Sequence, residues 1–223
     1  MKRALLIGVF IYSSLALPVF ARDQPKPDQN ELTPSILKSW TGDLDGMIER
    51  RVIRALVAPS RTSYWLNGPR QTGAEYELLK AFQEDINDHY KTQGKHILIH
   101  VVFIPTARDQ LIQGLLEGRG DIAAGILTVT PQRLEQLDFG TPFFHGVREI
   151  AVTGPASPNL SSIDDLSGKE VFVRKSSSYW THLERLNEQF VQEHKTPVVL
   201  KAAPEDLQDD DLLEMVNAGL VET

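Results

Sequence analysis

Two hydroxyls and a guanidinium follow an apolar run near the middle of this sequence. The run at 121–127 reads as a buried strand, and Thr128, Thr130 and Arg133 come directly after it. Hydroxyl donors beside a planar cation with five N–H donors suit a carboxylate better than a neutral or cationic ligand. The spacing therefore raises the possibility of a carboxylate-binding site.

A simpler alternative stays open for the same residues. Thr130 has the chemistry of a helix N-cap, and Pro131 would then occupy the first helical position, where proline is favoured. Arg133 would in that case form a surface ion pair with Glu135 or Asp138. Spacing alone favours this alternative over ligand binding.

Two further groups of residues follow predicted strands. Ser176 and Ser177 lie between a predicted strand at 169–174 and a predicted helix, where hydroxyls and free backbone N–H groups can bind an anion. A plain serine N-cap is the alternative there. Tyr64 and Trp65 follow the first predicted strand, and they could stack on a ligand or pack on the core.

The alternation of strands and helices is what could bring these groups together. In the first half the apolar patterns predict strand, helix, strand, helix, strand, and in the second half strand, helix, strand, helix. The predicted ranges are 51–57, 75–90, 96–104, 107–118 and 121–127, then 169–174, 178–194, 197–202 and 205–219. This order predicts parallel strands with helices on both faces, and ligands then bind beyond the carboxyl ends of the strands.

Composition and the N-terminus restrict the partners and the compartment. The net charge of −7 and the absence of a basic patch argue against nucleic acid and anionic membrane surfaces. Residues 1–21 have the basic start, apolar run and small-residue end of a secretory signal peptide, and 22–39 read as a polar, proline-bearing flexible leader. Cleavage after Ala21 is expected, and an uncleaved N-terminus, the less favoured alternative, would be the one route to membrane attachment. With no cysteine in the chain, disulfides play no part.

Catalytic and metal-binding motifs are not found in the sequence. It has no G-x-S-x-G, H-E-x-x-H or Walker loop, so no cofactor, metal or catalytic residue is predicted. Acidic residues at two predicted helix starts, Glu75 and Glu77 in one and 209–211 in the other, are expected on solvated faces that complement the helix dipole.

Three stretches, taken together, resemble the family 3 periplasmic solute-binding proteins. They are GAEYELLKAF, LLEGRGDIAAGILTVTPQRLEQLDFGTPFF and SSIDDLSGKEVFVRKSSSY, and the resemblance covers about 50–220. It implies an α/β fold of the periplasmic-binding-protein type, with two lobes of mostly parallel sheet: a first lobe at 40–150 and a partial second lobe at 151–223. The C-terminal return to the first lobe would be missing.

The resemblance also implies roles for particular residues. Arg133 would bind the ligand carboxylate, Thr128 would assist, Ser176 or Ser177 would add donors, and Tyr64 or Trp65 would cover the ligand. The sequence departs from the family pattern at Lys175, where glycine is usual. The acidic residue that commonly holds a ligand amine would come later than Gly219.

Other stretches, among them LQDDDLLEMVNAGL, resemble the N-terminal, non-catalytic region of the membrane-bound lytic murein transglycosylase F family. The implied protein is a periplasmic, monomeric domain for a small anionic or zwitterionic ligand, with a muropeptide among the candidates. By the resemblance it would be the regulatory N-terminal part of such a protein. Two alternatives stay open: a peptidoglycan lytic transglycosylase whose catalytic domain lies outside this chain, or a free transporter binding protein or receptor sensor domain.

Overall fold

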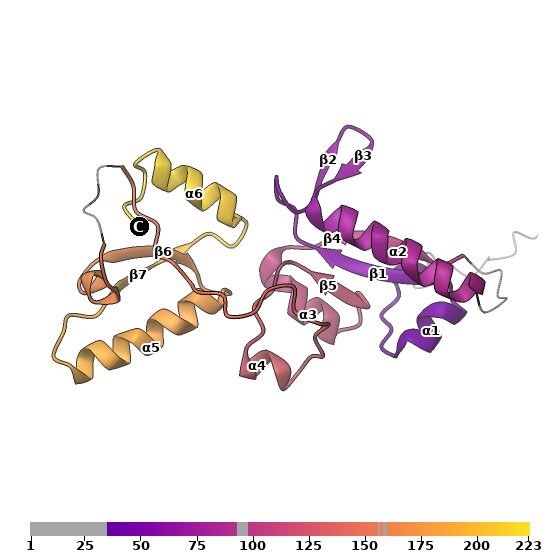
Figure 1. Cartoon of the computed structure of the whole chain (residues 1–223), viewed down its shortest axis with the longest axis horizontal. Coiled ribbons are helices and arrows are strands. Elements are labelled where there is room, and N and C mark those ends of the chain that lie inside the picture. The colour runs from indigo at the N-terminus through magenta and orange to yellow at the C-terminus, as the bar shows by residue number, and fades with distance from the viewer. Residues whose placement is uncertain (1–34, 93–97, 156, 158–159) are drawn as a thin grey trace, which may run out of the picture. The chain divides into compact units, whose positions relative to one another are not determined.

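The computed structural model describes residues 35–92, 98–155, 157 and 160–223. The expected signal peptide and residues 22–34 of the expected leader lie outside these residues. The helices are α1 (Leu44–Glu49), α2 (Ala74–Thr92), α3 (Leu111–Leu116), α4 (Pro131–Leu134), α5 (Ser178–Gln192) and α6 (Asp209–Asn217), with 3₁₀ turns η1 (Ser35–Leu37), η2 (Arg108–Gln110) and η3 (Ile163–Leu166). The strands are β1 (Val52–Val57), β2 (Trp65–Asn67), β3 (Arg70–Thr72), β4 (His100–Pro105), β5 (Ile122–Ala124), β6 (Glu170–Arg174) and β7 (Val199–Ala203) (Figure 1).

The first sheet is parallel, as the alternation of elements predicts. Its order is β4-β1-β5, and both neighbours of β1 run parallel to it. Alternate β1 residues face opposite sides of the sheet. Ile53 and Val57 pack in one core cluster with Leu79 of α2, whereas Leu56 packs in another with Leu111 of α3. Helices therefore cover both faces of this sheet, which confirms that prediction.

The second lobe repeats the arrangement on a smaller scale. β6 and β7 pair in parallel, and Leu186 and Phe190 of α5 form the buried core there with Leu166 and Val198. The helix predicted at 178–194 is thus present as α5, which ends two residues earlier than predicted. The antiparallel β2-β3 hairpin is an addition to the predicted elements.

One side-chain clamp recurs in both lobes. The Asn87 amide on α2 accepts from the Ile99 N–H at 2.8 Å and donates to the Ile99 carbonyl at 2.9 Å. Asn187 on α5 makes the same two bonds to Val198, at 2.6 and 2.9 Å. Each clamp satisfies backbone groups just before a strand begins, and so fixes the helix against the next strand.

A buried ion pair ties the start of the described chain to the first sheet. The Arg54 side chain on β1 is fully buried and donates from Nη2 to Asp121 at 2.8 Å. It also donates to the carbonyls of Lys38 and Trp40, at 2.8 and 3.0 Å. The last residues of the expected leader, 35–39, are therefore structured: they form η1, and the Lys38 carbonyl accepts a hydrogen bond from the buried Arg54.

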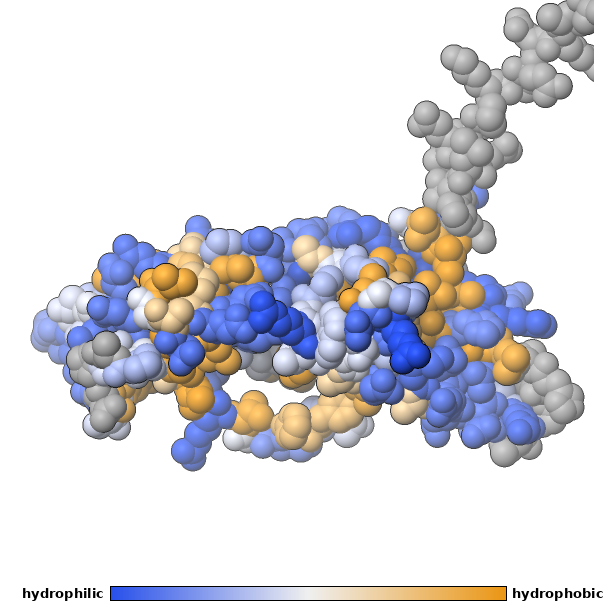
Figure 2. All heavy atoms as spheres, turned by 90° about the horizontal axis from the view of Figure 1, so that it is seen from above, coloured by the Kyte–Doolittle hydropathy of each residue, from blue (hydrophilic) through white to orange (hydrophobic). Residues whose placement is uncertain are grey.

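The segment between α4 and η3 has no helix or strand in its described part. It carries apolar side chains that are largely exposed, among them Phe143 and Phe144 at 75% and Ile150 at 81%. Apolar residues reach the surface in several places on the face shown in Figure 2, where they are orange.

Candidate functional site

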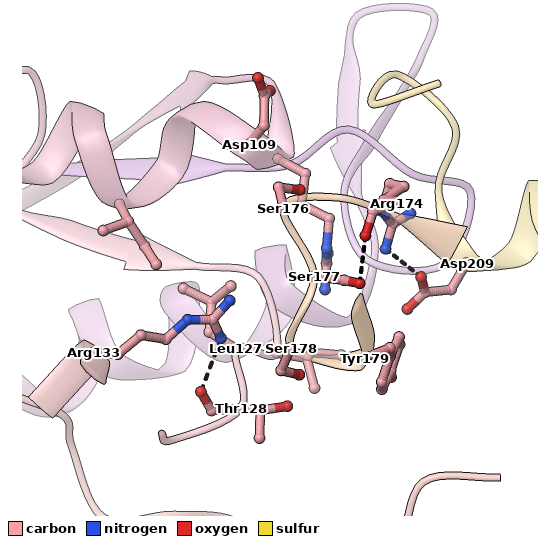
Figure 3. Close-up of a pocket in the computed structure, with 13 residues that line it drawn as sticks. Asp109, Leu127, Thr128, Arg133, Arg174, Ser176, Ser177, Ser178, Tyr179 and Asp209 are labelled. Carbon is pink, nitrogen blue, oxygen red and sulfur yellow. Dashed lines mark hydrogen bonds and ion pairs between the residues drawn. The ribbon is translucent and has the colours of Figure 1, made fainter. Parts of the chain in front are cut away.

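A polar pocket collects residues that follow the carboxyl ends of four parallel strands. Arg108 follows β4, Thr128 and Arg133 follow β5, Ser176 follows β6, and Asp209 follows β7. This is where ligands bind in open parallel sheets. The full lining is Arg108, Asp109, Ile112, Ile126, Leu127, Thr128, Arg133, Arg174, Ser176, Ser177, Ser178, Tyr179 and Asp209 (Figure 3).

Arg133 offers the pocket a half-buried cation. Its Nη1 donates to the Thr128 carbonyl at 2.9 Å, and Figure 3 shows the guanidinium directed toward Leu127 and Thr128. In the described part of the chain it forms no ion pair, so the surface pair with Glu135 or Asp138 is not formed. Burial, and secondly the charge of Arg108, lower the pKa of Arg133. The remaining N–H donors are available to an anion, because arginine stays charged.

Thr130 takes the capping position that the simpler alternative assigned to it. Its hydroxyl accepts from the Arg133 N–H at 3.3 Å at the start of α4, with Pro131 in the first turn. The side chain is buried, and it does not line the pocket. The cap holds α4, which carries Arg133, against the end of the strand segment.

Arg108 was missed by sequence reasoning. Its Nη2 donates to the Gly125 carbonyl at 2.7 Å, and it forms no ion pair within the described residues. The signal that could have found it is its place just after the predicted strand at 96–104. The same rule about strand ends that selected Arg133 applies there.

Ser176 and Ser177 of the second lobe line the pocket, but their hydroxyls already have partners. Ser176 donates its hydroxyl and its N–H to the Glu205 carboxylate, at 2.6 and 3.1 Å. Ser177 caps α5 by accepting from the Trp180 N–H, and it donates to the Arg174 carbonyl at 2.7 Å. The expected serine N-cap is therefore present at Ser177, and an acid of the same lobe occupies the donors of Ser176.

Arg174 and Asp209 form an ion pair at the pocket wall that sequence reasoning also missed (Figure 3). Arg174 is buried and donates in addition to the Leu207 carbonyl at 2.5 Å. Asp209 was expected on a solvated face of its helix. Asp209 is exposed as expected, with 49% of its side chain accessible, and its carboxylate in addition neutralises the buried Arg174, which ties the start of α6 to the end of β6.

Two other lining residues have unusual backbone or side-chain environments. Ile126 has a positive φ of 48°, a conformation that is costly for a β-branched residue and ends the β5 strand early. Tyr179 is 40% exposed at the start of α5, where the desolvation of its phenol, followed by the charges of Asp209 and Glu149, raises the pKa of that group. The phenol therefore remains a donor at neutral pH.

The two aromatic candidates do not line this pocket. Tyr64 is 3% exposed and stacks on Phe103 with ring centroids 5.6 Å apart, which is the core-packing alternative. Trp65 begins β2 and is 39% exposed. Both residues follow β1, as predicted. They lie at the start of the β2-β3 hairpin, however, and not in the pocket lining.

Glu75 requires a correction, because it does not lie on a solvated face. Its side chain is 4% exposed, and neither carboxyl oxygen has a hydrogen-bond partner. Burial raises the pKa of Glu75 to about 7, and the charge of Arg108 opposes this rise. Glu77, on the outer side of the same helical turn, is exposed as expected.

Within the described ranges, no cluster of three or more histidine, cysteine, aspartate or glutamate side chains could hold a metal ion. In the same ranges, no helix is long and apolar enough to cross a membrane.

Two parallel α/β units whose strand ends converge on one polar pocket are the architecture of a periplasmic-binding-protein-like fold, one of the open α/β folds that bind ligands at this edge. A model of the bacterial extracellular solute-binding proteins, family 3, matches residues 55–223, and the chain belongs to that family.

Among curated relatives, the chain is similar to membrane-bound lytic murein transglycosylase F. It is 28% identical over 181 residues to the protein of Pseudomonas fluorescens strain Pf-5, covering 80% of this chain and 34% of the relative. For the protein of Desulfosudis oleivorans the identity is 27% over 134 residues, and the match covers 60% of this chain and 27% of the relative. The chain thus spans about a third of the length of the first of these relatives. Family and relatives together point to the periplasm or cell envelope.

Solved structures support the fold. An ancestral arginine-binding protein bound to arginine matches with a TM-score of 0.58 and 21% identity, covering 78% of this chain and 68% of that one. An amino acid ABC transporter substrate-binding protein from Streptococcus pneumoniae, bound to L-arginine, matches with a TM-score of 0.57 and 17% identity. This match covers 80% of this chain and 68% of that one.

Proposed function

We propose that this chain is a solute-binding domain that captures a small carboxylate-bearing ligand, such as an amino acid, a peptide or a cell-wall fragment. The observation that carries the proposal is Arg133. It is a half-buried guanidinium at the wall of a polar pocket, and its side chain donates a hydrogen bond to the neutral carbonyl of Thr128. A desolvated cation without a carboxylate partner is costly unless an anion binds it.

The remaining residues take supporting roles in this proposal. Thr128 lies beside Arg133 in the lining, and Ser176 and Ser177 face the pocket from the second lobe. A ligand that reaches Ser176 has to displace or share the Glu205 carboxylate. Trp65 does not line the pocket, and its proposed role is to cover the bound ligand. Thr130 would contribute indirectly, by capping α4 and so positioning Arg133.

The names of structural neighbours support the ligand class. Several of them bind amino acids, and one, from Streptococcus mutans, is described in a study of glutathione import. A small zwitterion with an α-carboxylate is the chemistry that these ligands share.

Calorimetry with a panel of amino acids, dipeptides and cell-wall tripeptides tests the proposal. At least one member should bind, and Arg133→Gln should weaken its binding by roughly tenfold or more, because a charge-assisted pair is lost. Arg70→Gln is the matched control, since Arg70 is exposed on β3 and outside the pocket lining. Equal affinity of Arg133→Gln and the wild type would refute the assigned role.

The similarity to lytic murein transglycosylase F favours a second, more specific proposal. The chain would be the regulatory, non-catalytic part of such a protein, exported by a signal peptide at 1–21, with a leader to residue 39 and lobes at 40–150 and 151–223. The observation behind it is that the match covers most of this chain but a third of the relative.

Reading the gene beyond codon 223 separates the alternatives. A following lysozyme-like domain supports the transglycosylase proposal, whereas a neighbouring permease gene supports a transporter binding protein and a membrane helix supports a receptor. Co-sedimentation of the purified chain with peptidoglycan tests a muropeptide ligand directly.

A further inference from the structure

Two guanidiniums of the first lobe, Arg108 and Arg133, face the same pocket without an acidic partner. Each donates to one backbone carbonyl, that of Gly125 at 2.7 Å and that of Thr128 at 2.9 Å. No ion pair with a carboxylate forms at either in the part of the chain that the structure describes. They are close enough for the charge of Arg108 to lower the pKa of Arg133. Like charges this close repel, and the pocket wall gains stability when anions neutralise both.

The second lobe differs from the first, because its own acids satisfy its donors. Asp209 pairs with Arg174, and Glu205 accepts both donors of Ser176. The unmatched positive charge in the pocket is therefore that of the first lobe. Asp109 also lines the pocket, and its carboxylate accepts from Gln110 at 3.1 Å rather than pairing with Arg108.

Glu75 does not supply the missing partner either. The charge of Arg108 acts to lower the pKa of Glu75, yet neither oxygen of Glu75 receives a hydrogen bond. Burial keeps a proton on this carboxyl through much of the range up to neutral pH. Glu75 is thus not a hydrogen-bonded partner of Arg108, and the pocket that Arg108 lines is where an anion can reach it.

We propose that the ligand carries two carboxylates, one held by Arg133 and the second by Arg108. This inference rests on the proposed function, and it adds the second subsite and the ligand class: an acidic amino acid, or a peptide with a second free carboxylate. The lining has three arginines and two aspartates, so a ligand with two carboxylates and one ammonium matches its charge.

The test compares L-glutamate with L-glutamine, and D-glutamate with D-glutamine, by calorimetry on the full chain. Each pair has nearly the same shape and differs by one carboxylate. The wild type should bind the better glutamate enantiomer at least roughly tenfold more tightly than its amide, because a charge-assisted pair is worth that much.

Variants assign the preference to a residue. Arg108→Gln should bring the glutamate-to-glutamine ratio close to one while glutamine binding is kept. Arg133→Gln should weaken both ligands, and Arg70→Gln should change neither. The inference is overturned if the wild type binds the two members of each pair equally, or if the ratio survives in Arg108→Gln. If only monocarboxylate members of the panel bind, the inference fails and the proposed function stands; if no member binds, both fail.

Discussion

Arg54 and Asp121 form an ion pair in which both side chains are fully buried, with 2.8 Å between Nη2 and Oδ1. Asp121 also accepts the Arg54 N–H at 2.6 Å and pairs with Arg50. One carboxylate thus joins β1 to the residue before β5, while the arginine holds the carbonyls of Lys38 and Trp40. The pair fixes the sheet from which the pocket loops emerge.

Asp121→Asn should lower the free energy of unfolding by roughly 3–5 kcal/mol, because it leaves the buried Arg54 charge uncompensated. Urea denaturation followed by circular dichroism measures this. The control is Glu117→Gln, which breaks the exposed Arg119 pair and should cost about 0–1 kcal/mol. Comparable losses in the two variants would contradict the structural role of the buried pair.

The same aspartate should make the protein sensitive to acid. Burial raises the pKa of Asp121, but hydrogen bonds from Arg54 and Arg50 outweigh it and hold the pKa below the ordinary value of 3.8. The stabilisation is therefore present above about pH 4 and is lost as the pH falls through the folded pKa. Denaturation between pH 5 and 2 should show this loss in the wild type. A wild-type stability that does not fall over this range would contradict the lowered pKa.

Glu75 should act in the opposite direction at higher pH. Its folded pKa is about 7, above the ordinary 4.5, so the folded protein keeps a proton that the unfolded chain has released. Stability should fall as the pH rises from about 4.5 to about 7, by at most about 3 kcal/mol, and then level off. Thermal melts at pH 5 and pH 8 measure the difference.

Glu75→Gln should remove most of this dependence, since the amide has nearly the same shape and does not titrate. Glu77→Gln, an exposed change in the same helical turn, should leave the pH dependence as in the wild type. The assignment fails if Glu75→Gln and the wild type lose stability equally between pH 5 and 8.

Thr130→Val should cost about 1 kcal/mol of stability, because the N-cap of α4 is lost from a buried position. Since α4 carries Arg133, ligand affinity should fall as well, even though Thr130 does not line the pocket. Thr130→Ser keeps the hydroxyl and should restore both properties. Full ligand affinity in Thr130→Val would show that the cap does not position Arg133.

Much of the fold could be predicted from the spacing of apolar residues. The apolar run of β1 predicted a strand buried on both faces, as it is. On α2 the apolar spacing is only partly matched, because Leu79 and Ile86 are buried whereas Leu78 and Phe82 are exposed. The strand-end rule likewise placed Thr128, Arg133, Ser176 and Ser177 at the pocket. The same rule applied to the end of β4 would have found Arg108.

Charged residues were harder to predict than apolar ones. Glu75 and Asp209 both stand at helix starts, where an acid is normally exposed, yet Glu75 is buried, whereas Asp209 is exposed and also pairs with Arg174. Both acids lie in the first turn of their helix, so their position along the helix does not distinguish them. The difference depends on which segments pack against each turn, and those contacts are distant in the sequence.

The sequence by itself determined the parallel α/β units, the order of their elements and the edge at which polar side chains gather, since these follow from local periodicity and strand ends. Only the tertiary structure decided which charges are neutralised. Arg54 meets Asp121 sixty-seven residues later, Arg174 meets Asp209, and Arg108 and Arg133 meet no acid among the described residues. Electrostatic pairing depends on distance in space, which the linear spacing of residues does not contain.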